Sequence, residues 1–318
     1  MKLSIIIASY NEKKYIKDAI ESCINQKHNY DYELIIGDDG SDDGSLEIIN
    51  EYEKNYPQII KSFVMDRTDV GEIIASIRVS NLLKRAFEIS NGEYIMVMSA
   101  DDLLVDPLKI EKQVCFLDSH LKYVSCYTDF QNFWDDGKTE KIHMKKNLSR
   151  SLLWSFPYIH ISCFLFRKEI ISNLLCRFCD DTGLTFSIIK TGHIKHLDCI
   201  TFGYRQRDES IMHKADKMEL CLLELSLYQD VLNSGKFSIS SLSRYAKVIE
   251  YILINREKLK EVKYHKYIRS CSQYKNDILG MIVNYEKLSF FKKLKIKNKI
   301  LFGKIFREIF SLIIVLRK

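Results

Sequence analysis

The sequence of 318 residues has little proline and glycine, and it lacks the patterns that mark several large protein classes. Only 3 prolines and 12 glycines leave no room for a long flexible linker. No stretch reaches the roughly 18 apolar residues that a spanning helix needs. The first ten residues show no secretory pattern, since a short apolar run ends at polar Asn11 without a small-residue cleavage site. We therefore expect a cytoplasmic protein.

The nine cysteines form no regular disulfide framework. Cys176 and Cys179 make a lone C-x-x-C without a second pair, which favours core or chance positions over a zinc or redox site. Hydrophobic residues make up 46% and charged residues 28% of the chain, as in an ordinary folded protein.

Charge is placed unevenly along the chain. Residues 291–318 contain nine Lys or Arg and one acid, so this tail's +8 leaves about −2 of the total +6 for the rest. A near-neutral body argues against nucleic-acid binding. In the tail (about 290–318), a stripe of Leu and Ile faces many lysines. The tail therefore predicts a basic amphipathic helix, which either lies on an anionic membrane surface or packs against the body.

Hydrophobic periodicity predicts strands alternating with helices over the first hundred residues. Strands are expected near 3–8, 33–37, 59–65 and 94–98, and helices near 13–26, after Asp42 or Asp43, and over 70–90. Strands separated by helices imply a parallel sheet. Asp106-Pro107 is typical of a helix start.

Further strands are expected at 124–130, 163–166 and 194–197, and helices at 220–232, 242–254 and 264–286. The pattern becomes helical after about residue 215. We expect an α/β domain over 1–212 and a helical C-terminal region over 213–318.

Three polar clusters follow predicted strands: Ser9-Tyr10-Asn11, Asp38-Asp39-Gly40-Ser41 and Ser99-Ala100-Asp101-Asp102. Ligands bind at the carboxyl ends of strands in such sheets. Turn and capping roles also suit these residue types, but they do not explain why two clusters carry adjacent carboxylates. The clusters therefore indicate a ligand site.

The sequence contains neither G-x-G nor a P-loop, so glycine-rich backbone does not cradle phosphates here. Adjacent carboxylates instead suggest Mg²⁺ or Mn²⁺ bridging the protein to a diphosphate.

Three segments resemble the family 2 glycosyltransferases of the GT-A fold: SIIIASYNEKKYIKDAIESCINQ, YELIIGDDGSDDGS and NGEYIMVMSADD. The resemblance covers about residues 3–118 strongly and thins to about 212. It implies a Rossmann-like mixed α/β sheet and an inverting, metal-assisted transfer of one sugar from a nucleotide-diphosphate sugar, expected to be a UDP-sugar.

The resemblance also implies roles for single residues. Ala8, Ser9 and Tyr10 would line the nucleoside pocket, Asp39 would read the base edge, and Arg78 would lie near the diphosphate. Ser99-Ala100-Asp101 occupies the D-x-D position, with Asp101 and Asp102 as the candidate metal ligands. Ser99 departs from the family pattern, which weakens the expected use of metal without abolishing it.

An inverting transfer needs a general base. The resemblance implies Asp181 for this role, with the neighbouring Asp180 as the alternative. Asp181 would also suit a helix N-cap. Arg205 or Arg207 would neutralise the leaving diphosphate, or would be solvated loop charges. Candidate acceptor-wall residues, which core packing would also explain, are Trp154, Tyr158 and His160.

The sequence thus predicts a cytoplasmic glycosyltransferase, peripheral at the inner face of the cell membrane, acting in polysaccharide biosynthesis for the cell envelope. The acceptor would be a saccharide or a lipid-linked saccharide, because many enzymes of the family it resembles use lipid-linked acceptors. Q-x-x-R-W is missing, so a single addition is expected. The alternatives are a catalytically degenerate sugar-nucleotide binder and a sugar nucleotidyltransferase.

Overall fold

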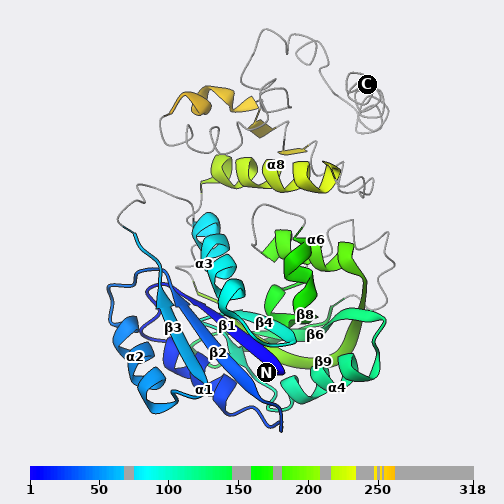
Figure 1. Ribbon diagram of the computed structural model, residues 1–318. Helices are drawn as coiled ribbons and strands as arrows, with labels where there is room; N and C mark the ends of the chain where they lie inside the picture. The colour runs from blue at the N-terminus through cyan, green and yellow to red at the C-terminus, as the bar shows by residue number, and fades with distance from the viewer. Residues whose placement is uncertain are drawn as a thin grey trace. The chain divides into compact units, whose positions relative to one another are not determined.

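The computed structural model describes the residues 1–67, 75–144, 159–174, 181–207, 216–233, 247–248, 251–252 and 254–261. The chain divides into two compact units, one of Met1–Lys214 with Asp230–Lys236, the other of Ala215–Gln229 with Phe237–Lys318. Within the described residues, the first unit is built on a nine-stranded sheet (Figure 1). Cys176, Cys179 and the basic tail lie outside the described residues.

The N-terminal half of the sheet is parallel, as the sequence predicts. In chain order it comprises β1 (Leu3–Ser9), α1 (Ile16–Ile24), β2 (Tyr32–Asp38), α2 (Ser45–Asn55), β3 (Ile60–Val64), α3 (Ala75–Ile89) and β4 (Tyr94–Ser99). These strands lie side by side in the order β3-β2-β1-β4. Helices α1 and α2 cover one face of the sheet and α3 covers the other (Figure 1). The central strands are therefore buried on both faces, which is why they are mostly apolar.

The C-terminal half makes the sheet mixed. It comprises β5 (Leu103–Leu104), α4 (Lys109–Ser119), β6 (Tyr123–Phe133), β7 (Thr139–Ile142), η1 (Ile161–Cys163), β8 (Phe164–Arg167), η2 (Lys168–Asn173), α6 (Asp181–Thr191) and β9 (His193–Arg205). The order continues β4-β8-β6-β9-β5, with β7 paired to β6. Strand β8 is antiparallel to both β4 and β6, whereas β6 and β9 are parallel. The mixed sheet is thus confirmed, and a wholly parallel sheet is wrong beyond β4.

The helix predicted to start at Asp106-Pro107 begins slightly later, at Lys109. Asp106 instead stabilises the turn before α4, because its Oδ1 accepts a hydrogen bond of 2.9 Å from the Leu108 N–H.

The described part of the C-terminal region contains α8 (Lys217–Asn233) and η3 (Arg256–Lys260). Helix α8 confirms the prediction for 220–232. Only scattered residues of 242–254 are described, and 264–286 lies outside the described residues. In the part of the chain that the structure describes, no helix is both long and apolar enough to cross a membrane.

Candidate active site

The loops after β1 and β2 are tied together by short polar side chains. Asn11 adopts a left-handed backbone conformation (φ 54°), which asparagine tolerates better than most residues. Its N–H donates to Ser41 Oγ (2.8 Å), and its Oδ1 accepts from the Asp42 N–H (3.0 Å). The Asp43 carboxylate accepts a hydrogen bond from the Lys13 N–H (2.9 Å) and another from the N–H of Ser45 (2.9 Å), the first residue of α2. These bonds fix the two loops relative to each other.

The two adjacent carboxylates after β2 have different roles. Asp38 is buried, and it accepts hydrogen bonds of 2.7 Å from both the N–H and the Oγ of Ser41. Asp38 therefore builds the turn, as the capping alternative proposes. Asp39 is held differently, because buried Arg78 donates to both of its carboxylate oxygens.

Arg67 completes a cluster around Asp39. Its Nη2 donates to Asp39 Oδ2 (2.9 Å), and its Nη1 donates to the Tyr10 hydroxyl. The Arg67 guanidinium carbon lies 3.7 Å from the centre of the Tyr10 ring, so the planar cation stacks on the ring. The predicted nucleoside residues Tyr10 and Asp39 are thus brought together, with Arg67 between them.

The cluster after β4 joins the same edge of the sheet. The Ala100 N–H donates to the Ala8 carbonyl (3.0 Å), which extends the pairing of β1 and β4 beyond Ser99. Ser9 lies next to Ala8 and is buried, and within the described residues its Oγ has no hydrogen-bond partner.

Asp102 is fully buried beside other acids. Its Oδ1 accepts from the Arg205 N–H (2.9 Å), while its Oδ2 has no partner among the described residues. Burial, together with the charges of Asp101 and Asp181, raises the pKa of Asp102 well above its usual range. Asp181 therefore lies near Asp102, at the exposed start of α6. Asp180, the other candidate base, lies outside the described residues.

Arg207 bridges Glu12 and Asp101 at the same edge of the sheet. It donates to both carboxylate oxygens of Glu12 (2.8 and 2.6 Å), and its Nη2 lies 2.8 Å from Asp101 Oδ2. Burial raises the pKa of Glu12 to about 7, assisted by Asp101 and opposed by Arg207. Burial also raises the pKa of Asp101, against the opposing charge of Arg207.

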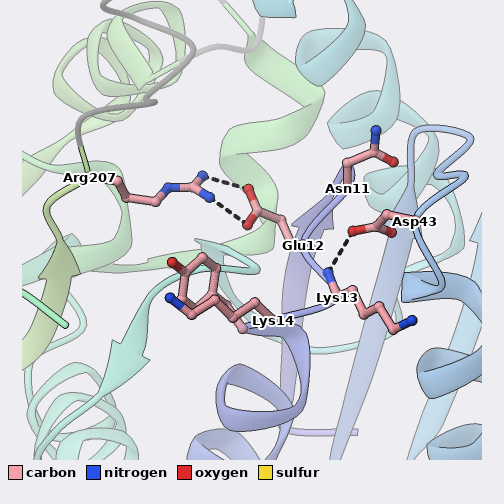
Figure 2. A pocket seen from close by; sticks show the side chains of 7 residues that line it. Asn11, Glu12, Lys13, Lys14, Asp43 and Arg207 are labelled. Atoms are coloured by element: carbon pink, nitrogen blue, oxygen red, sulfur yellow. Dashed lines mark hydrogen bonds and ion pairs between the residues drawn. The ribbon is translucent and has the colours of Figure 1, made fainter.

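A hollow of about 490 Å³ opens beside this bridge (Figure 2). Figure 2 shows Arg207 reaching from beyond β9 to Glu12, and Asp43 bonded to the Lys13 backbone. The lining residues are Asn11, Glu12, Lys13, Lys14, Tyr15, Asp43 and Arg207. Three of them are cationic and two, Glu12 and Asp43, are acidic, so the lining carries a formal charge of +3 − 2 = +1.

The Arg205 guanidinium packs on aromatic rings and is hydrogen-bonded within the protein. Its guanidinium lies over the rings of Tyr15 (4.2 Å) and Phe133 (4.5 Å) and donates to the Asp101 carbonyl (2.8 Å) and to Asp135. Arg205 therefore fixes the backbone at Asp101 from the end of β9.

His160 is buried in an aromatic cluster. Its ring lies 4.9 Å from that of Phe202 and 4.7 Å from that of Tyr204. Burial lowers the pKa of His160 to about 3, assisted by the charge of Lys109, so the imidazole is neutral at pH 7. Trp154 and Tyr158, the other acceptor candidates, lie outside the described residues.

The structure thus brings most of the predicted residues to one edge of the sheet, from the ends of β1, β2, β4 and β9. Sequence reasoning missed Glu12 and Arg67. Glu12 directly follows the first polar cluster, and this adjacency is the signal that could have found it. No comparable signal marks Arg67, because its partners lie far from it in the sequence.

Comparison with protein families identifies the family of this chain. The family described as Glycosyl transferase family 2 matches residues 4–175. An uncharacterized protein of Mycobacterium tuberculosis is 29% identical over 171 residues, which cover 52% of this chain and 47% of the relative. The poly(ribitol-phosphate) beta-glucosyltransferase of Bacillus spizizenii is 36% identical over 105 residues, which cover 33% of this chain and 15% of the relative. The chain therefore spans about half, or less, of the length of these relatives.

A solved structure, S. aureus TarS 1–349 in complex with UDP-GlcNAc, shares the fold. It matches with a TM-score of 0.61 and 15% identity, covering 84% of this chain and 80% of that one. At 15% identity, the similarity shows a shared fold and does not show a shared substrate.

Proposed function

Because the chain belongs to glycosyl transferase family 2 and is a glycosyltransferase with the GT-A fold, we propose that it moves one sugar from a UDP-sugar to a saccharide or lipid-linked saccharide, with inversion at the anomeric carbon. The observation that carries this proposal is the meeting of Tyr10, Asp39, Asp101 and Arg207 at one edge of the sheet.

The nucleoside pocket of the proposal lies between the ends of β1 and β2. The base stacks on Tyr10, and Asp39 accepts the N3–H of uracil, with Ala8 and Ser9 beside them. Arg78 donates to both carboxylate oxygens of Asp39, so in the proposal it orients this carboxylate beside the donor. The Arg67 guanidinium stacks on Tyr10 and must leave before a base stacks there.

The diphosphate end of the donor lies toward Asp101 in the proposal. Carboxylate oxygens suit Mn²⁺ or Mg²⁺, and the partnerless Oδ2 of buried Asp102 fits a site for such an ion. Asp101 and Asp102 would hold the ion, with Ser99 nearby, and the ion would neutralise the diphosphate charge. Arg207 supplies positive charge at the same place, next to the hollow. Because Arg205 is enclosed by two rings, Arg207 is the better diphosphate partner of the two.

The transfer step uses Asp181 as general base. The acceptor hydroxyl oxygen attacks the anomeric carbon, Asp181 takes the hydroxyl proton, and the bond to the diphosphate oxygen breaks on the opposite face. This role is supported by the exposed position of Asp181 at the start of α6 and by its nearness to Asp102.

The cellular setting of the proposal is the synthesis of a cell-envelope polysaccharide at the inner face of the membrane. One relative is named as a poly(ribitol-phosphate) beta-glucosyltransferase. The basic tail (about 290–318) would bring the enzyme to an anionic membrane surface.

A matched pair of variants tests the base. Asp181→Asn removes the proton acceptor, and Asp136→Asn makes the same change in an exposed turn that the structure assigns no chemical role. We expect Asp181→Asn to lower the transfer rate about 10²–10⁴-fold with an unchanged Kd for UDP, and Asp136→Asn to change neither. Equal transfer by Asp181→Asn and the parent chain would remove Asp181 from the mechanism. UDP binding without transfer in the parent chain would favour a degenerate binder.

A further inference from the structure

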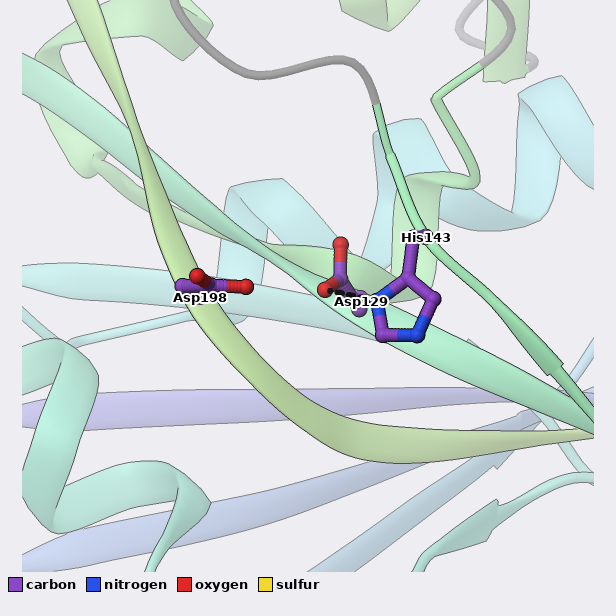
Figure 3. Close-up of side chains that lie close together, drawn as sticks. All are labelled: Asp129, His143 and Asp198. Atoms are coloured by element: carbon purple, nitrogen blue, oxygen red, sulfur yellow. Dashed lines mark hydrogen bonds and ion pairs between the residues drawn. The ribbon is translucent and has the colours of Figure 1, made fainter.

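Three potential metal ligands converge outside the active site (Figure 3). Asp129 lies in β6, His143 follows β7, and Asp198 lies in β9. One ligand atom from each residue lies within 4.8 Å of the others. Asp129 and His143 are brought together by the antiparallel pairing of β6 with β7, in which Phe130 is opposite Ile142, and Asp198 joins them from β9.

Asp129 is held as an oriented ligand would be. The residue is fully buried, and its Oδ1 accepts from His196 Nε2 (2.7 Å) and from the Met144 N–H (2.8 Å). Its Oδ2 faces His143 Nδ1 at 3.0 Å. Outer hydrogen bonds of this kind fix the direction of metal-binding carboxylates. His143 and Asp198 are exposed, so solvent and ions reach the cluster from their side.

A strand irregularity places Asp198 at this point. In the pairing of β6 with β9, Thr128 is opposite Leu197 and Asp129 is opposite Ile200. Asp198 and Cys199 are therefore extra residues in β9. Bulges of this kind redirect side chains, and they recur beside functional sites.

We propose that Asp129, His143 and Asp198 form a Zn²⁺ site, completed by water. One imidazole nitrogen and two carboxylate oxygens make a three-ligand set that zinc accepts in tetrahedral geometry. Mg²⁺ and Ca²⁺ prefer more oxygen ligands and no imidazole. Bound zinc cross-links β6, β9 and the segment after β7, so it stabilises the fold.

The zinc site is separate from the donor site. Its three residues, Asp129, His143 and Asp198, include none of the residues assigned to the donor site. The proposal therefore stands independently of the proposed function, and its test needs neither nucleotide nor sugar.

The experiment uses Co²⁺ as a spectroscopic probe on the full chain, freed of metal by a chelator and kept reduced. We expect one equivalent of Co²⁺ to give the strong visible absorption of a tetrahedral site without the near-ultraviolet band of a thiolate ligand. Zn²⁺ should displace the Co²⁺ and raise the Tm.

Variants assign the site. His143→Ala and Asp198→Asn each remove an exposed ligand, so neither is expected to disturb folding, and each should weaken Co²⁺ binding by about 100-fold or more. His193→Ala removes an exposed histidine of the same strand as Asp198, and it should leave Co²⁺ binding unchanged.

Three results would overturn the proposal. The first is the absence of Co²⁺ and Zn²⁺ binding at micromolar concentrations, which would leave Asp129 and His143 as an ion pair. The second is a thiolate band, which would place the metal on cysteine. The third is undiminished binding in both His143→Ala and Asp198→Asn.

Discussion

Arg67 occupies the place that the proposed nucleobase needs, so its removal should tighten nucleotide binding. The guanidinium stacks on Tyr10 at 3.7 Å and donates to Asp39 at 2.9 Å, the two contacts assigned to the base. In Arg67→Ala the guanidinium no longer contacts the Tyr10 ring or the Asp39 carboxylate, while Arg78 still donates to Asp39.

The size of the effect follows from the contacts that a base must displace. A cation–π contact at an accessible site contributes about 0.5–1 kcal/mol. An ion pair as exposed as that of Arg67, whose side chain is 36% accessible, contributes about 0.2–1 kcal/mol. Together they oppose base binding by about 0.7–2 kcal/mol, so the Kd for UDP should fall about 3- to 30-fold.

Calorimetric titration of UDP into the parent chain, Arg67→Ala and Arg85→Ala measures this effect. Arg85 is an exposed arginine of α3 paired with Glu88, and its removal should leave the Kd unchanged. A Kd that rises in Arg67→Ala would show that Arg67 binds the nucleotide itself, and the displacement argument would be refuted.

Two further predictions concern the framework under the site. Glu33 is buried, and although burial alone would raise its pKa, bonds from Ser4, Asn91 and Lys61 outweigh burial and lower it. The ionised carboxylate therefore stabilises the fold above about pH 4.5, and this contribution is lost as the pH falls through the lowered pKa. Glu33→Gln should lower the free energy of unfolding, measured in urea, by about 1–2 kcal/mol at pH 7. The difference from the parent chain should become smaller toward pH 3.5, and a difference that stays constant with pH would contradict the stabilising role of the ionised Glu33 carboxylate. In Gly92→Ala the new Cβ would lie 2.3 Å from the Ser4 backbone nitrogen, so strand β1 must shift. We expect Gly92→Ala to lower the free energy of unfolding by about 3 kcal/mol or more in the same assay. A decrease below about 1 kcal/mol would show that the backbone of β1 can shift at little cost.

The edge that carries the site could be predicted from the sequence because its strands are regular. β1, β2 and β4 each contain a short apolar run and are followed by a polar cluster, so the position of Asp39 and Asp101 near strand ends follows from the pattern alone. Asp38 shows the limit of this reasoning, since only the hydrogen bonds distinguish a turn-building carboxylate from its neighbour.

The remaining features depend on contacts between distant segments. The four residues of β8 carry no signal of direction, so its antiparallel insertion between β4 and β6 was not predictable. Glu12 and Arg207 are paired although they are 195 residues apart in the sequence. The sequence left Arg205 as either a diphosphate partner or a solvated loop charge, whereas in the structure its guanidinium lies over two aromatic rings. Burial decided these roles, and the sequence does not show burial for single polar residues.

Calorimetric titration of UDP with Mn²⁺ and with EDTA is the most direct test of the donor site. GDP and dTDP serve as nucleotide controls, and Asp101→Ala is the variant. We predict UDP binding that requires Mn²⁺, exceeds that of GDP and dTDP, and vanishes in Asp101→Ala. If the folded parent chain bound none of these nucleotides, or if Asp101→Ala bound UDP as the parent does, the donor site placed at Tyr10, Asp39 and Asp101 would be contradicted.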